Sequence, residues 1–241
     1  MYGWRAKLGI EMPVDNTVVE PEMWAMVPNG VTIHSIRVEG KKELTGEERS
    51  QSMCQMGWEN AYMLRGTDAI GYCCQHSSFA KGVGWDLEMV KKIEENSGKP
   101  ATTAATAMVR SMKEMGIKKV GVVAPYSESA NQVLSGFLEG NGIKVVKIAS
   151  LPTVPGPMEI VKIPIAVTYR LAKEADSPEA DGVFISSTDL TAVSILSALE
   201  SDLKKTVISV NQAVLWDLLR LVGVCQPVKG FGSLLGRGLE G

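Results

Sequence analysis

Two strand-and-loop units occur twice in this chain of 241 residues, at almost the same separation. Residues 9–13 (GIEMP) match residues 121–125 (GVVAP) 112 positions later, and residues 68–74 (DAIGYCC) match residues 181–187 (DGVFISS) 113 positions later. Two independent units that recur at nearly one separation predict an α/β protein of two similar, flavodoxin-like halves with parallel sheets, related by a pseudo-twofold axis. Loops at the carboxyl ends of the strands would then open onto one cleft between the halves, where we expect the active site.

The rest of the chain alternates strand-like and helix-like segments, which supports the α/β class. Apolar runs that stop at proline, glycine or polar residues predict strands, and periodic apolar positions predict helices. Strands are expected at 7–12, 31–38, 68–72, 119–124, 144–149 and 206–210, with another within 181–187. Helices are expected to start at 20 and to cover 46–65, 86–96, 101–115, 130–139, 165–175, 192–203 and 213–222.

The last of these helices decides the expected domain division. Asn211 and Gln212 are expected to cap it, and the helix is expected to cross back to the first half. One half should therefore comprise residues 1–100 plus 212–241, and the other residues 101–211.

Composition excludes several kinds of partner. A formal net charge of −2 gives no electrostatic reason to expect nucleic acid or an anionic membrane, and no apolar run is long enough to span a bilayer. Four cysteines are too few for a disulfide framework in a chain of this length, and without a CxxC pair they form no zinc motif. We therefore expect a cytoplasmic protein with reduced thiols that binds a small molecule. A homo-oligomeric state is left open.

A cluster of nucleophilic and polar side chains follows the strand 68–72, namely Cys73, Cys74, Gln75 and His76. Neighbouring residues on an extended strand point to opposite faces, so a Cys74 that faces the cleft leaves Cys73 in the core. Cys74 is either a thiolate nucleophile or a small buried hydrophobic residue, and its place in the repeat favours the first interpretation. His76 is equally compatible with lowering the pKa of Cys74, binding a carboxylate, or a structural hydrogen bond.

Four linked segments carry a more specific signal than any single motif. They are the loop 13–22 (PVDNTVVEPE), Cys74, Pro125-Tyr126 with Asn131, and residues 209–216 (SVNQAVLW). In this order they resemble the aspartate/glutamate racemase superfamily, and within it the branch of maleate cis-trans isomerase and arylmalonate decarboxylase. The resemblance implies chemistry without a metal or cofactor, in which hydroxyl and amide donors stabilise the charge that develops on a substrate carboxylate as an enediolate.

The resemblance also implies roles for individual residues. Cys74 matches the cysteine that adds to the double bond in the isomerases, and Ser187 occupies the equivalent position in the other half; these two are the expected catalytic pair. By the resemblance, Asn16 is expected to bind a substrate carboxylate. Tyr126 is expected to bind it as well, because of its place after Pro125 beside a cleft that needs hydrogen-bond donors. The other expected binding residues, in the loops that follow the strands, are Gln75, His76 and Thr188. Asn16 is also placed to form an Asx-turn that starts a helix, and both of its roles can hold together.

The chain departs from the family pattern at two positions. Ser187 stands where a second cysteine is expected, and Pro157 stands where the isomerases have a carboxylate-binding asparagine. A serine hydroxyl is a far weaker acid than a thiol, so racemisation by two bases is disfavoured. We expect chemistry that needs one thiol, first the cis-trans isomerisation of a maleate-like dicarboxylate. The alternatives are decarboxylation of a substituted malonate and, in a different class, a carboxylate-binding protein without turnover.

Overall fold

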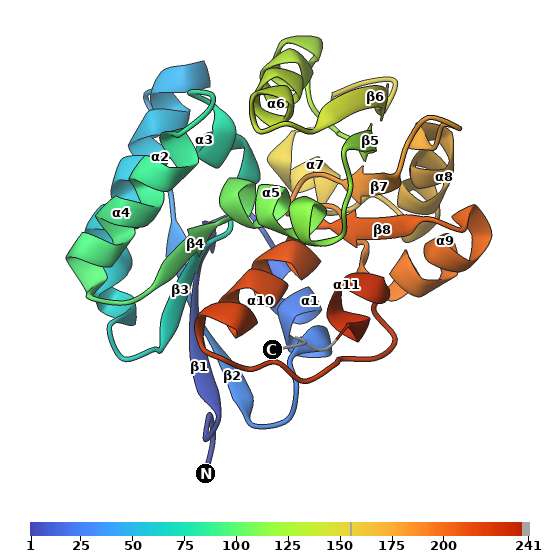
Figure 1. The fold of residues 1–241 in the computed structure, drawn as a ribbon. Coiled ribbons are helices and arrows are strands. Elements are labelled where there is room, and N and C mark those ends of the chain that lie inside the picture. The colour runs from blue at the N-terminus through green and yellow to red at the C-terminus, as the bar shows by residue number, and fades with distance from the viewer. Residues whose placement is uncertain (155, 238–241) are drawn as a thin grey trace.

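The computed structural model describes residues 1–154 and 156–237 and contains two parallel sheets of four strands (Figure 1). The strand orders are β2-β1-β3-β4 and β6-β5-β7-β8, so the two sheets have the same relative order, and all neighbouring strands are parallel. This is the order of the first four strands of a flavodoxin-like sheet, which confirms the predicted architecture of two similar α/β halves. The strands are β1 (Ala6–Pro13), β2 (Val31–Val38), β3 (Ala69–Tyr72), β4 (Ala101–Thr103), β5 (Lys119–Val123), β6 (Lys144–Ala149), β7 (Gly182–Ile185) and β8 (Thr206–Ser209).

The repeat extends to individual hydrogen bonds. In the first half, the Asp68 carboxylate accepts from the backbone N–H of Lys7 over 2.7 Å, and the backbone N–H of Asp68 donates to the Lys7 carbonyl over 2.7 Å. In the second half, Asp181 makes the same two bonds with Lys119, both at 2.8 Å. Each aspartate therefore fixes where its strand begins to pair with the central strand of its sheet.

Helices lie on the faces and edges of both sheets (Figure 1). They are α1 (Val19–Met26), α2 (Gly46–Asn60), α3 (Gln75–Phe79), α4 (Trp85–Ser97), α5 (Ala104–Glu114), α6 (Glu128–Gly140), α7 (Pro157–Ile160), α8 (Ile165–Ala175), α9 (Leu196–Leu203), α10 (Val210–Leu221) and α11 (Ser233–Gly236), with the 3-10 turns η1 (Ala61–Leu64) and η2 (Val193–Ile195). In the part of the chain that the structure describes, no helix combines the length and the apolar character needed to cross a membrane.

The stretch 101–115, expected to be one helix, is a strand followed by a helix. Its first three residues pair with β3 as the edge strand β4, and α5 begins at Ala104. The change occurs at Thr103, whose hydroxyl accepts a hydrogen bond from the backbone N–H of Thr106 over 3.1 Å and caps the helix. A strand of three residues is too short to show an alternating pattern, so it could not be predicted from the sequence.

Two other boundaries differ from expectation. Helix α10 begins at Val210 and is capped by the Ser209 hydroxyl, which accepts from the backbone N–H of Gln212 over 3.3 Å. Asn211 and Gln212 lie within its first turn, so the predicted cap was wrong. The residues after Cys74, expected to be a loop, form the short helix α3.

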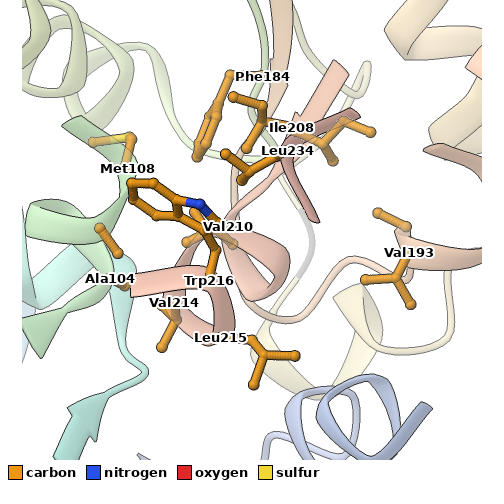
Figure 2. Close-up of a cluster of buried hydrophobic side chains, with 14 of the residues drawn as sticks. Ala104, Met108, Phe184, Val193, Ile208, Val210, Val214, Leu215, Trp216 and Leu234 are labelled. Carbon is orange, nitrogen blue, oxygen red and sulfur yellow. The ribbon is translucent and has the colours of Figure 1, made fainter. Parts of the chain in front are cut away.

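Helix α10 is the centre of the core between the two sheets (Figure 1). Ten of its twelve residues are buried, among them the polar Asn211, Gln212 and Asp217, so the helix is covered by other elements on nearly every side. Figure 2 shows Trp216 of α10 beside Met108 of α5, in the apolar cluster where both helices meet the second sheet. On the other side, a Cβ atom on Gly71 of β3 would lie 3.0 Å from Leu218 and 3.1 Å from Val214. Helix α10 therefore packs closely on the first sheet as well.

The division into residues 1–100 plus 212–241 and residues 101–211 stays a prediction. Strand β4 lies in the first sheet, just beyond the boundary expected at residue 100. Residues 238–241 of the first half lie outside the described part of the chain.

Candidate active site

A cavity of about 370 Å³ is surrounded by the loops that follow β1, β2, β3, β5 and β7, so both halves contribute to it. Its lining includes Cys74, His76 and Tyr126 of the predicted site. A wider hollow of about 660 Å³ beside α2 and α4 contains none of the predicted site residues. Besides those three residues, the cavity is lined by charged side chains (Asp15, Glu39, Arg49, Asp189), by apolar ones (Pro13, Val14, Met53, Pro125, Ala130, Val154, Ile160), and by Gly46, Ser50, Ser77 and Ser127.

Cys74 is the cysteine of the adjacent pair that reaches the cavity. It is half-buried, whereas Cys73 is fully buried in the core, as the alternation of strand faces predicts. Burial raises the pKa of Cys74; hydrogen bonds from Ser77 counteract the rise, and the Asp189 carboxylate adds to it. The resting site therefore holds a thiol rather than a thiolate at neutral pH.

Three hydrogen-bond donors of the second half converge on one atom beside the cavity. They are the backbone N–H of Ser187 at 2.5 Å, the Ser186 hydroxyl at 3.0 Å and the Tyr126 hydroxyl at 3.4 Å. The atom that accepts from all three is Oε1 of Gln75, which belongs to the first half. Burial raises the pKa of Tyr126, so its hydroxyl stays protonated. Donors gathered in this way are suited to stabilise an oxyanion.

Asn16 forms the predicted Asx-turn at the start of α1. Its Oδ1 accepts from the backbone N–H groups of Val18 and Val19, both at 2.9 Å. Its amide nitrogen donates to the Thr188 hydroxyl of the other half over 3.2 Å. These two predicted binding residues therefore contact each other, and their binding of a substrate carboxylate stays a prediction.

His76 packs in the cavity wall against aromatic rings. Its ring centroid lies 5.4 Å from that of Phe79 and 5.8 Å from that of Tyr126, and its Nδ1 lies 3.4 Å from the Ser50 hydroxyl. Burial lowers the pKa of His76, so the imidazole is neutral at neutral pH. A neutral ring supplies no positive charge to lower the pKa of Cys74, which leaves hydrogen bonding as its means of contact with a ligand.

Ser187 lies behind the residues that line the cavity. It is 3% exposed, its backbone N–H binds Gln75, and its Oγ accepts from the backbone N–H of Asp189 over 3.3 Å. Its φ of +81° lies in the left-handed region, which is uncommon for serine. The catalytic role of Ser187 opposite Cys74 stays a prediction.

Asp189 is a functional candidate that the sequence analysis missed. It lines the cavity, and burial together with the nearby Asp15 carboxylate raises its pKa to about 6, although a hydrogen bond from Ser187 partly offsets this. A carboxyl group that changes protonation near neutral pH is suited to proton transfer. The sequence feature that could have identified Asp189 is its position two residues after Ser187, in a loop that was already expected to face the cleft.

The sequence analysis also gave no role to Glu22, although this residue lies in the motif loop 13–22. One carboxylate oxygen accepts from the backbone N–H groups of Ala192 at 2.6 Å and Val193 at 3.0 Å. The other accepts from the amide of Asn211 at 2.8 Å. Burial raises the pKa of Glu22, and these hydrogen bonds lower it. Glu22 thus ties α1 to two segments of the second half and fixes their relative position.

Two parallel-sheet halves, and a cysteine in the cavity that both halves line, are what the resemblance to the aspartate/glutamate racemase superfamily predicted. A family model described as arylmalonate decarboxylase matches residues 9–235. The chain belongs to this family.

Relatives of known activity include both branches named above. A maleate isomerase of Pseudomonas putida is 23% identical over 246 residues, which cover 95% of this chain and 96% of the relative. An arylmalonate decarboxylase of Bordetella bronchiseptica is 26% identical over 160 residues, which cover 65% of this chain and 66% of the relative. The predicted branch of the superfamily is therefore confirmed.

Solved structures confirm the fold. The maleate isomerase Iso of Pseudomonas putida S16, as a variant with maleate, superposes with a TM-score of 0.88 at 20% identity, covering 95% of this chain and 97% of that one. A maleate cis-trans isomerase variant of Nocardia farcinica with a covalently bound succinylcysteine intermediate gives 0.86 at 20% identity, with coverage of 95% and 97%. An arylmalonate decarboxylase variant in liganded form, with a glycine-to-cysteine and a cysteine-to-serine substitution, gives 0.83 at 22% identity, with coverage of 95% and 97%.

Proposed function

We propose that the protein is a cysteine-dependent, cofactor-independent isomerase that acts on a small dicarboxylate of the maleate type. The observation that carries the proposal is a thiol, Cys74, in a cavity beside donors that converge on one oxygen. A nucleophile next to an oxyanion site is what addition to a conjugated carboxylate requires. The maleate isomerase that matches nearly the whole chain supports this reading, as does the succinylcysteine in a similar structure.

The reaction begins when the Cys74 thiol loses its proton to a base in the cavity, for which Asp189 is placed. The sulfur then forms a bond to one carbon of the double bond, and the π electron pair moves onto the adjacent carboxylate as an enediolate. The donors stabilise this charge while the former double bond, now single, rotates. The electron pair returns, the carbon–sulfur bond breaks, and the trans isomer leaves. The thiolate takes its proton back, so atoms and electrons balance.

A second candidate reaction, the decarboxylation of a substituted malonate, is favoured by the mainly apolar cavity wall. Such a wall destabilises the carboxylate that leaves as CO₂. The carbon–carbon bond breaks with release of CO₂, its electron pair forms the enediolate, and the Cys74 thiol protonates the α-carbon. The thiolate left behind then takes a proton from solvent. The decarboxylase variant described above carries the same two residue types, cysteine and serine, that this chain has at Cys74 and Ser187.

Incubation with maleate and, separately, with phenylmalonate distinguishes these reactions by proton NMR. Isomerisation produces fumarate from maleate, and decarboxylation produces phenylacetate from phenylmalonate. The Cys74→Ser variant is the matched control and should form neither product. Binding of these acids without any product would support the carboxylate-binding protein instead, and equal turnover by Cys74→Ser would refute both enzyme proposals.

The cytoplasm is the proposed location, with a small carboxylate as the partner. A catalytic thiol must stay reduced, and the cytoplasm provides that condition. The four cysteines are free thiols, which agrees with it.

A further inference from the structure

The hydrogen-bond donors that would bind a substrate oxygen are already bonded to a side chain of the protein, that of Gln75. The backbone N–H of Ser187 can only donate, so the Gln75 atom 2.5 Å from it must be the amide oxygen rather than the nitrogen. The amide nitrogen of Gln75 donates to the Met108 sulfur at 3.2 Å, which is a weak acceptor. The side chain is therefore held mainly through its oxygen, by the groups suited to an oxyanion.

The Gln75 side chain also separates these donors from the cavity. Gln75 is 1% exposed, Ser186 is fully buried and Ser187 is 3% exposed, and none of the three lines the cavity. Tyr126 and Cys74 do line it. A ligand in the cavity as it stands can therefore touch Tyr126 but not Ser186 or Ser187.

We propose that Gln75 is a displaceable plug of the carboxylate site: its amide oxygen occupies the donors in the empty protein, and a ligand carboxylate binds there only when the side chain swings out. The ligand class rests on the proposed function, whereas the occupied donor set does not. The plug makes Gln75 a residue that determines specificity rather than one that takes part in the chemistry.

The exchange favours anions over neutral ligands. Hydrogen bonds to a carboxylate are about twice as strong as those to a neutral amide oxygen, so only a charged ligand gains by replacing Gln75. Little hydrogen bonding is lost when the amide nitrogen moves, because its acceptor among the described residues is the weakly accepting Met108 sulfur. The backbone need not move, since the Ser78 hydroxyl donates to the Gln75 carbonyl over 2.8 Å and is itself bound by Ala105. An uncharged amide or ester of the ligand acid should not displace the Gln75 side chain.

The test measures binding of succinate, a saturated dicarboxylate to which no thiol can add, by isothermal titration calorimetry. If the side chain fills the donors about nine-tenths of the time, Gln75→Ala should bind succinate about tenfold more tightly than the unaltered protein. Gln75→Glu, which places a permanent carboxylate on the donors, should lose succinate binding. Gln132→Ala, an exposed glutamine on α6 outside the cavity, is the matched control and should change nothing. Succinamide should bind to none of them.

Weaker or unchanged succinate binding in Gln75→Ala would overturn the proposal, as would no binding in either protein. Circular dichroism confirms that each variant is folded. A crystal structure of the unaltered protein with succinate gives an independent measurement: the proposal requires the contact between Gln75 and Ser187 to be broken, and an intact contact with bound succinate refutes it. Because succinate is not a substrate, a failure of the proposed reaction shows in the NMR assay and leaves this test intact.

Discussion

The amide of Asn16 donates a hydrogen bond to the hydroxyl of Thr188 over 3.2 Å, so the loops that follow β1 and β7 touch each other. Beside this contact, Glu22 binds the backbone of Ala192 and Val193. Residues near the start of the chain are thus bonded to residues about 170 positions later. These hydrogen bonds hold the two halves together at one end of the cleft, next to the cavity.

Loss of the Asn16 side chain should destabilise the protein. Asn16→Ala removes the acceptor for two N–H groups at the start of α1 together with the link to Thr188, so the free energy of unfolding should fall by about 1–2 kcal/mol in urea denaturation. Thr188→Val removes only the link and leaves the turn intact, so its loss should be smaller. Equal losses would show that the turn contributes nothing.

Turnover should depend on Cys74 and not on Cys73. Cys74→Ser removes the nucleophile with almost no change in shape and should abolish product formation in the NMR assay while ligand binding persists. Cys73→Ser alters a side chain in the core and should retain activity per folded molecule. Full activity in Cys74→Ser would end the thiol mechanism.

The Tyr126 hydroxyl should matter to the chemical step. Tyr126→Phe removes one of three donors for the developing charge, so kcat should fall about 10²-fold. Tyr62→Phe, at an exposed position outside the cavity, should leave kcat unchanged. If kcat is the same in Tyr126→Phe, this hydroxyl does not contact the charge.

The pH dependence of kcat/KM should separate the two candidate reactions. Burial raises the pKa of Cys74. As the pH rises through that pKa the thiolate fraction grows, so addition to a double bond should become faster on the alkaline side. Proton donation by the thiol should instead become slower over the same range. A profile that falls with pH for maleate would contradict the proposed isomerase mechanism.

Asp189 should make the protein less stable as the pH rises from about 4 to about 6. Its pKa is raised from an ordinary 3.8 to about 6, so the folded state holds its proton more tightly and stability decreases as the proton leaves. Asp189→Asn should therefore raise the free energy of unfolding at pH 7, by at most about 3 kcal/mol, and leave it nearly unchanged near pH 3, below the unfolded pKa.

Denaturation in urea at the two pH values provides the measurement. Asp202→Asn is the control, because the pKa of Asp202 is shifted in the opposite direction. Hydrogen bonds and charge from Tyr169 and Lys173 lower it. This variant should gain no stability at pH 7. A stabilisation of Asp189→Asn that is the same at both pH values would exclude the titration of Asp189 as its cause.

The parts of the fold that depend on pattern were predictable. The repeat predicted two similar sheets because equal spacing and strand-end residues, such as Asp68 and Asp181, survive in both halves, although strand β4 was missed. The cleft followed from parallel strands, whose carboxyl ends share one edge; the repeat assigned Cys74 to that cleft, and the alternation of strand faces then left Cys73 in the core.

The hydrogen-bond partners and protonation states of buried polar side chains could not be predicted in the same way. The sequence predicted Gln75 and Ser187 in one cleft, but not that the Gln75 amide oxygen accepts from the Ser187 backbone, because that depends on one side-chain rotamer. Glu11 is another example: read as part of an apolar strand, it is fully buried, and in the described part of the chain neither carboxylate oxygen has a hydrogen-bond partner. Burial raises its pKa well above the ordinary value, so a charged residue type is present as a neutral side chain.

The position of α10 means that the repeat boundary is not a place where the protein can be divided. This helix follows the last strand of the second sheet, yet Leu218 and Val214 lie against Gly71 of the first. A cut between the repeats would leave the apolar face of β3 exposed to water, and α10 would keep its contacts with the second sheet but expose the side chains that now pack on the first. Two fragments made in this way should need each other to fold, because the larger cluster of buried apolar residues includes side chains from both halves.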